Sequence, residues 1–294
     1  MNIAAHGDAG RAWLAALPAL VAELEDRWQL TDVGPAFEGG VVGFVAPAVR
    51  RDREPVVVKI SYVEDETRNE ADALAFWDGH GAVGLLDADR DRGALLLERL
   101  EPGTSLDAHP DRDEAISVAC SLLRRLWHPV PDPHPFGSVP DRAARWAHEL
   151  AERFQRAGAP FDRHLVDQAT RLCVELARSR EEPVLANSDY HLGNVLASRR
   201  EPWVLIDPKP LVGERAFDTG HFLRSLLPVD LDPSAVGRLT KRLASELSLG
   251  PERVRAWAFV RSVEDALWGL TVGSDAEWDL ECARVLAGLR RGRR

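Results

Sequence analysis

The hydrophobic pattern of this chain changes at about residue 100, and this change constrains the fold more than any other feature of the sequence. Before it, short β-like runs predominate, interrupted by a helix-period segment at residues 66–79. After it, long helical patterns predominate, broken by a β-like cluster at residues 184–207. A period of two is typical of strands and a period of 3.6 of helices. The pattern therefore predicts a strand-rich part followed by a helix-rich part.

The individual segments are read from the same periodicities. The β-like runs cover residues 43–49, 55–61, 83–89 and 94–100. The helical patterns cover residues 10–28, 112–127, 141–157, 162–179, 233–247, 251–270 and 276–290. The two parts are joined by "EPGTS" (101–105), a short connection with Pro and Gly that favours a hinge over a flexible linker. We therefore expect lobes at 1–100, with a leading helix, and at 101–294.

Composition excludes several classes of protein. With 294 residues the chain is long enough for one large domain or two lobes, and its formal net charge of −10 argues against a nucleic-acid binder. No apolar run approaches the roughly 20 residues that cross a membrane, and the N-terminus lacks a signal-peptide pattern. The three cysteines show no paired or metal-binding spacing. We expect a cytoplasmic enzyme or binding protein, with no obligate protein partner indicated.

Residues 184–210, "VLANSDYHLGNVLASRREPWVLIDPKP", place two carboxylates and an amide at the ends of apolar runs. A hairpin across this stretch would bring Asp207 close to Asn194, and their hard oxygen donors suit Mg²⁺ with its phosphate ligands. Asp189, five residues before Asn194, is left to accept the proton of an attacking hydroxyl, as phosphoryl transfer from ATP requires. The alternative is that these side chains only cap turns. An ATP-binding part upstream would decide against that alternative.

A candidate for that upstream part lies in "PVVVKIS", where Lys59 sits inside an apolar run. A strand lysine paired with a helix glutamate holds the ATP phosphates in protein kinases, and Glu70 lies in the following helical segment. The alternative is an edge-strand lysine that faces water. Gly39 and Gly40 would let the backbone approach the phosphates, but they do not form GxGxxG, and an ordinary hairpin turn is nearly as good an interpretation.

At these residues the sequence resembles the aminoglycoside phosphotransferases, small-molecule kinases with the protein-kinase fold. The stretches that carry the resemblance are "HLGNVLASRREPWVLIDPKPLVGERAFD" (191–218) and "NEADALAFWDGHGAVGLLDADRDRGALLLERLEPGTSL" (69–106). Within the family they look most like the branch of streptomycin 6-phosphotransferases and hydroxyurea phosphotransferases. The similarity runs from about residue 30 to about residue 270.

The resemblance implies an α+β, protein-kinase-like bilobal fold with a strand-rich N-lobe and a helical C-lobe. It implies ATP and Mg²⁺ as cofactors and a small-molecule acceptor, with these roles: Asp189 as catalytic base, Asn194 and Asp207 as metal ligands, Lys59 with Glu70 at the phosphates, Glu98, Arg99 and Leu100 within the adenine-reading hinge Leu97–Leu100, and Asp218 as the buried anchor of the catalytic loop. The loop departs from the family's usual His-Gly-Asp, because it reads Asn187-Ser188-Asp189. Ser in place of a Gly at φ > 0 would be strained, so reduced turnover is one expectation.

The sequence says less about the acceptor substrate than about ATP and the metal. An aminoglycoside such as streptomycin is cationic, and carboxylates that accept paired hydrogen bonds would hold its guanidinium groups. Glu264 or Asp265, with Trp268 one turn away, is the predicted contact, and solvated helix-face charges are the alternative. Three functions stay open: resistance to such an antibiotic by phosphorylation, phosphorylation of hydroxyurea, a sugar or a natural-product intermediate, and nucleotide binding by a pseudokinase. His191 is interpreted as a loop-packing residue.

Overall fold

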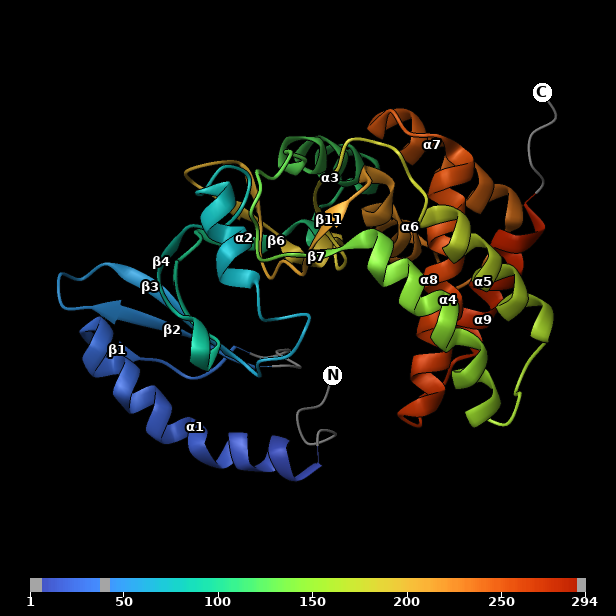
Figure 1. Cartoon of the computed structure of the whole chain (residues 1–294). Helices are drawn as coiled ribbons and strands as arrows, with labels where there is room; N and C mark the ends of the chain where they lie inside the picture. The colour runs from blue at the N-terminus through green and yellow to red at the C-terminus, as the bar shows by residue number, and fades with distance from the viewer. Residues whose placement is uncertain (1–6, 38–42, 290–294) are drawn as a thin grey trace. The chain divides into compact units, whose positions relative to one another are not determined.

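The chain forms two compact units in the computed structural model, which describes residues 7–37 and 43–289 (Figure 1). Unit 1 comprises Met1–Ser105 and Leu196–Lys209, and unit 2 comprises Leu106–Val195 and Pro210–Arg294. The first border falls between Ser105 and Leu106. Residues 196–209, which follow the predicted catalytic loop in the chain, belong to unit 1, so each unit is built from two separate stretches of sequence.

Unit 1 is organised around a five-stranded antiparallel sheet of order β1-β2-β3-β5-β4. Its strands are β1 (Leu30–Val33), β2 (Gly43–Arg50), β3 (Pro55–Ser61), β4 (Leu85–Asp89) and β5 (Ala94–Glu98). β3 is the middle strand, and Lys59 lies opposite Val45 of β2 and Leu95 of β5. Lys59 is therefore not an edge-strand lysine, and the alternative interpretation of it is wrong.

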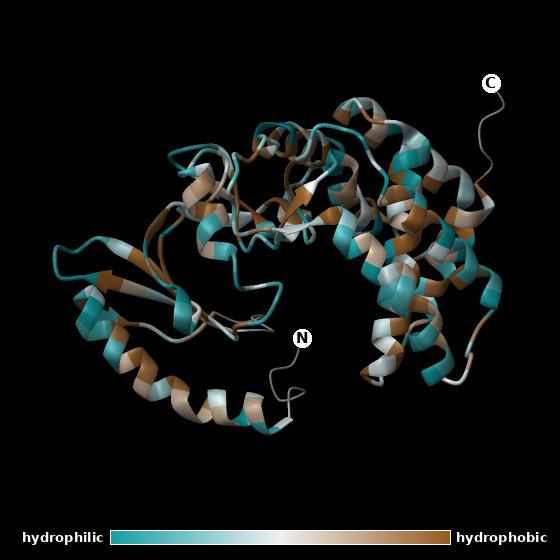
Figure 2. Cartoon of the chain, in the orientation of Figure 1, coloured by the Kyte–Doolittle hydropathy of each residue, from teal (hydrophilic) through white to brown (hydrophobic). Residues whose placement is uncertain are grey.

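The two faces of β3 have different neighbours. Helix α1 (Gly7–Trp28) packs its Leu24 and Trp28 against Val58 and Ile60 of β3 to form the core of unit 1. Figure 2 shows α1 banded in hydrophobic and hydrophilic colours, as expected for a helix with one face in the core. Because side chains alternate across a strand, Lys59 points to the other face of the sheet. There it meets helix α2 (Glu70–Trp77).

A second, three-stranded sheet of order β10-β9-β6 completes unit 1. It consists of β6 (Pro102–Ser105), β9 (Val195–Ser198) and β10 (Trp203–Leu205). The end of β10 is tied to the segment after α2, because the Leu205 N–H donates to Gly81 and the Leu205 carbonyl accepts from Val83. This attachment sets the position of Asp207, which follows two residues later.

Unit 2 is mostly helical. Its helices are α3 (Arg112–Leu126), α4 (Val139–Arg156), α5 (Arg163–Leu176), α6 (Thr219–Leu226), α7 (Pro233–Leu247), α8 (Pro251–Thr271) and α9 (Glu277–Gly288). Helix α8 contacts α4, α5, α6, α7 and α9, and its Trp257 and Phe259 are fully buried. Four of these helices begin with a side-chain oxygen that accepts from backbone N–H groups of the first turn. The capping residues are Asp111 for α3, Ser138 for α4, Asp162 for α5 and Asp232 for α7.

A small sheet of order β7-β11-β8 holds the start of the predicted catalytic loop in unit 2. Strand β8 (Val184–Asn187) is buried throughout and pairs with β11 (Pro210–Gly213), with Asn187 opposite Pro210. β7 (Gly137–Ser138) pairs with β11 on its other side. Within residues 7–37 and 43–289, no helix has the length and apolarity that a membrane crossing requires.

Candidate active site

In unit 1, Lys59 is held between two carboxylates. Its Nζ lies 2.6 Å from Glu70 Oε1 and 2.5 Å from Asp207 Oδ1. Lys59 and Glu70 are buried, whereas the Asp207 side chain is 43% exposed. The structure therefore brings together the three residues that the sequence assigned to ATP phosphates and metal in this unit.

The charge balance of this cluster keeps the lysine protonated. Burial opposes the positive charge of Lys59, but Glu70 and Asp207 together outweigh it and raise the lysine's pKa. Burial raises the pKa of Glu70, and the neighbouring Lys59 acts in the opposite direction. When both carboxylates around the one ammonium are ionised, the cluster carries an excess negative charge. A cation near Asp207 would offset this excess.

Asp207 has a backbone that few residues adopt. Its φ of 51° lies in the left-handed region, in which a non-glycine side chain is strained. The residue follows β10 directly before a proline, and its carboxylate remains half-exposed while one oxygen contacts Lys59. This combination of local strain and an accessible hard oxygen fits a residue that holds a metal ion.

The predicted adenine-reading hinge, Leu97–Leu100, begins in β5 and continues beyond its end at Glu98. The Glu98 side chain accepts from the Gly84 N–H at 2.8 Å and from Arg200 at 2.6 Å, and its own N–H donates to Gly84. The Glu98 carboxylate is therefore occupied by hydrogen bonds within unit 1. The next two residues of the hinge are the exposed Arg99 and the half-buried Leu100. Gly39 and Gly40 lie outside the described residues.

In unit 2, the predicted catalytic loop is anchored at Asn187. The Asn187 N–H donates to Asp218 Oδ1 at 2.7 Å, and the Trp127 ring N–H donates to Asp218 Oδ2 at 2.7 Å. Burial raises the pKa of Asp218, while these two donors lower it by favouring the carboxylate. The Asn187 side-chain oxygen accepts from the Asp189 N–H at 3.1 Å, which closes a turn at Asp189.

Ser188 does not have the backbone conformation that the family's glycine led us to expect. The non-glycine residues with positive φ in the described chain are Gln29, Arg53, Asp78, Ala159, Asp207 and Ser248. Ser188 is not one of them. The expected strain at this position is therefore absent, because the Asn187 turn holds the loop in a conformation that serine accepts.

Asn194 is oriented by a hydrogen bond to Asp189. Its amide nitrogen donates to the Asp189 carbonyl at 3.2 Å, so its amide oxygen is directed away from that carbonyl. The 3₁₀ turn Leu192–Asn194 that carries it begins at His191, whose Nδ1 accepts from the Gly193 N–H at 3.1 Å. Since a hard amide oxygen is presented by a fixed side chain, Asn194 fits the predicted metal-ligand role.

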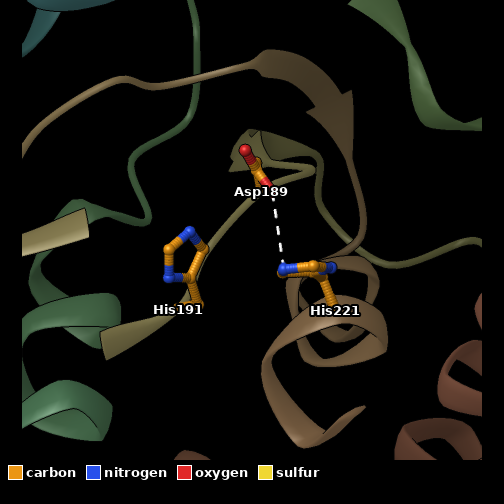
Figure 3. A group of neighbouring side chains, drawn as sticks. All are labelled: Asp189, His191 and His221. Carbon is orange, nitrogen blue, oxygen red and sulfur yellow. Dashed lines mark ion pairs between the residues drawn. The ribbon is translucent and has the colours of Figure 1, made fainter. Parts of the chain in front are cut away.

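The sequence interpretation missed the side chain that lies beside Asp189. His221, in the first turn of α6, has its Nε2 3.4 Å from Asp189 Oδ1 (Figure 3). Its sequence signal is a spacing of three residues from Asp218, which by itself does not indicate a contact with residue 189. His191 also lies near this carboxylate, with its ring 5.5 Å from that of His221.

The predicted acceptor residues on α8 occupy two different environments. Glu264 pairs with Arg153 at 3.0 Å. Asp265 pairs with Arg224 at 2.6 Å and with Arg261 at 3.0 Å. Both carboxylates are thus already matched by arginines, which the sequence interpretation did not identify.

Trp268 lies one turn further along α8. Its surface is 41% exposed, and it lines a groove of about 420 Å³. The groove is also lined by Glu149, Glu152, Arg153, Arg156 and Thr271.

Comparisons with known proteins agree with this chemistry. A family model described as aminoglycoside/hydroxyurea antibiotic resistance kinase matches residues 27–273. A streptomycin 6-kinase from Streptomyces glaucescens is 38% identical over an alignment of 276 residues, which covers 92% of this chain and 89% of that protein. A hydroxyurea phosphotransferase from Kitasatospora aureofaciens is 36% identical over 289 residues, 96% of this chain and 82% of that protein.

Solved structures show the same fold. The choline kinase LicA from Streptococcus pneumoniae has a TM-score of 0.65 at 11% sequence identity, covering 93% of this chain and 99% of that chain. The macrolide 2'-phosphotransferase MphH from Brachybacterium faecium has a TM-score of 0.56 at 19% identity, covering 95% of this chain and 100% of that chain. At these identities the likeness concerns the fold alone. It confirms the predicted α+β, protein-kinase-like architecture.

Proposed function

Because the chain belongs to the family of aminoglycoside/hydroxyurea antibiotic resistance kinases, we propose that it transfers a phosphoryl group from ATP to a hydroxyl of a small molecule. The observation that carries the ATP half of this proposal is the buried Lys59 between Glu70 and Asp207. An ammonium fixed on a central strand by a helix carboxylate is the arrangement that positions ATP phosphates in kinases. The backbone of Arg99 and Leu100 would read the adenine.

The residues of the catalytic loop would perform the chemistry on the acceptor. A bond forms between the acceptor oxygen and the γ-phosphorus, the bond from that phosphorus to the β–γ bridging oxygen breaks, and ADP leaves. Asp189 takes the proton of the acceptor hydroxyl. Asn194 and Asp207 would hold Mg²⁺, which would supply positive charge to the phosphates. The Asn187 turn and the Asp218 anchor keep Asp189 in place, which supports an active enzyme over a pseudokinase.

An aminoglycoside such as streptomycin, with resistance as the result, is the acceptor that the relatives favour. A second streptomycin 6-kinase, from Streptomyces griseus, is 34% identical over 92% of this chain. Hydroxyurea is the second candidate, because the hydroxyurea phosphotransferase matches 96% of this chain. For a cationic acceptor, the proposed contacts are Asp265 or Glu264 with Trp268.

An acceptor screen tests the function. The parent protein and Asp189→Asn are incubated with Mg·ATP and with streptomycin, other aminoglycosides, hydroxyurea or an amino sugar, and ADP release is measured. We expect acceptor-dependent ADP release with streptomycin. Asp189→Asn should lose about 10²–10⁴-fold of turnover, the usual effect of removing a general base, while it still binds ATP.

The outcomes of the screen are distinct. Release with hydroxyurea alone would select the second candidate. ATP binding without acceptor-dependent release for any compound would favour the pseudokinase. Parent-like turnover by Asp189→Asn would show that another residue is the base.

A further inference from the structure

The contact between His221 and Asp189 is built by the same anchor that holds the catalytic loop. Asp218 accepts from the Asn187 N–H, two residues before the base, and it lies three residues before His221 in the chain. One buried carboxylate therefore fixes both the loop that carries Asp189 and the helical turn that carries the histidine. The 3.4 Å approach of Nε2 to Oδ1 follows from this shared attachment.

The surroundings of His221 favour its neutral form. Burial lowers its pKa to about 3, and the nearby guanidinium of Arg261 acts in the same direction. The other charged groups that face it are Arg224 on its own helix, Asp265 on α8 and Asp189 itself. The carboxylates of Asp189 and Asp265 act in the opposite direction, but the pKa of His221 stays lowered. Asp265 is already paired with Arg224 and Arg261. A neutral imidazole has one N–H to donate.

The position of the ring decides which nitrogen carries that proton. Nε2 faces Asp189, whereas Nδ1 lies on the side away from it (Figure 3). Nδ1 is buried and has no hydrogen-bond partner among the described residues. The tautomer with the proton on Nε2 places the N–H toward a carboxylate, and it leaves a bare lone pair rather than an N–H in the unpaired position. This tautomer satisfies more of the ring's polar groups.

A metal ion is the alternative for this cluster. The ligand atoms of Asp189, His191 and His221 all lie within 4.8 Å of one another. However, His191 Nδ1 accepts from the Gly193 N–H, so in neutral His191 the proton sits on Nε2. Binding a metal through Nε2 would require the opposite tautomer and the loss of that hydrogen bond. Hydrogen bonding accounts for the cluster without this rearrangement.

We propose that His221 is a positioning residue for the base: its neutral ring donates the Nε2–H to Asp189 Oδ1 and so holds the second carboxylate oxygen toward the acceptor hydroxyl. This proposal rests on the role of Asp189 in the proposed function. A neutral donor fixes the carboxylate without an adjacent full positive charge, which would make the base weaker. Arg224 and Arg261 both pair with Asp265, so the Asp265 carboxylate offsets part of their positive charge near Asp189.

Two substitutions separate hydrogen bonding from packing. His221→Gln places an amide N–H near the position of Nε2, whereas His221→Leu has no donor and fills a similar volume. With saturating ATP and the acceptor found in the screen, His221→Leu should lose about 10–100-fold in kcat, the range expected when a reacting group is misplaced by about 1 Å. The KM for ATP should not change. His221→Gln should stay within a few-fold of the parent.

The pH profile adds a readout that packing would not move. An N–H donor favours the charged carboxylate, so its loss in His221→Leu should shift the acidic limb of kcat/KM for the acceptor to higher pH. The limb of His221→Gln should match that of the parent. Far-UV circular dichroism and Tm establish that both variants are folded. Parent-like kcat and pH profile in His221→Leu, or equal loss in both variants, would overturn the proposal.

NMR of the ring nitrogens tests the contact independently of turnover. In ¹⁵N-histidine-labelled protein, the His221 signals are assigned by their absence in His221→Gln. They should report a neutral ring protonated on Nε2 from pH 5 to pH 8. Titration of His221 in that range, or a proton on Nδ1, would overturn the proposal. Absence of phosphoryl transfer by the parent with every acceptor would instead overturn the proposed function, and with it any catalytic role for this contact, even where the NMR result holds.

Discussion

Replacing Lys59 with Met tests whether the cluster in unit 1 is a buried ion pair. The substitution keeps the volume of the side chain but leaves Glu70, whose side chain is only 4% exposed, without its cation. A buried charge that loses its partner costs about 3–5 kcal/mol. The Asp207 carboxylate can turn to water, because it is 43% exposed, so Glu70 accounts for most of the effect.

Protonation of Glu70 limits that cost and makes it depend on pH. Keeping a proton on a carboxyl with an ordinary pKa of 4.5 costs about 3 kcal/mol at pH 7 and less than about 1 kcal/mol at pH 5. Above pH 4.5 the folded variant retains a proton that the unfolded chain has released. Its stability therefore falls as the pH rises. We expect the stability that Lys59→Met loses relative to the parent to be larger at pH 7, where it is at most about 3 kcal/mol, than at pH 5.

Urea denaturation at the two pH values measures this difference, followed by circular dichroism and tryptophan fluorescence. The matched control is Lys59→Met combined with Glu70→Gln, which removes the titrating group. This double variant should recover most of the stability at pH 7, while kcat/KM for ATP stays low. An equal loss of stability at pH 5 and pH 7 in Lys59→Met would refute the reasoning, because it would show that Glu70 is not the group left uncompensated.

Two further predictions concern the metal ligands and the acceptor. Asn194→Ala and Asp207→Ala should both raise the Mg²⁺ concentration that gives half-maximal activity, Asp207→Ala more so because it removes a charge; an unchanged Mg²⁺ titration of Asp207→Ala would contradict its metal role. Asp265→Asn and Trp268→Ala should raise the acceptor KM more than the ATP KM, with the effect of Asp265→Asn larger at low salt. Glu264→Gln should mainly lower the Tm, because its partner arginine is left inside unit 2. Steady-state kinetics in which none of these variants changes the acceptor KM would place the acceptor elsewhere.

The longer elements could be predicted from the sequence because their signals are local. The pattern at 233–247 coincides with α7, and the pattern at 251–270 lies within one residue of α8. A 3.6-residue period repeated over several turns needs no knowledge of the rest of the chain. The run at 55–61 likewise coincides with β3, because a short run that is apolar apart from Lys59 and Ser61 is typical of a buried strand.

The short elements were missed for the converse reason. Helix α6 has eight residues and begins with Thr219 and Gly220, so its period is too brief to recognise. Strand β11 has four residues and exists because it pairs with β8 and β7. The missed helix carries His221, and its first turn is placed by the hydrogen bonds of Asp218 to distant parts of unit 2.

The sequence by itself determined which residues are available for chemistry: a lysine in a strand, a glutamate in the next helix, and the spacing of Asp189, Asn194 and Asp207. These features lie within short segments, and their residue types carry the chemistry directly. Only the tertiary structure decided their partners. Lys59 meets Asp207 across 148 positions of sequence, and arginines from other helices neutralise the carboxylates of α8. Such pairings depend on how the helices and strands pack, because a buried charge is stable only where packing brings an opposite charge or a hydrogen-bond donor to it.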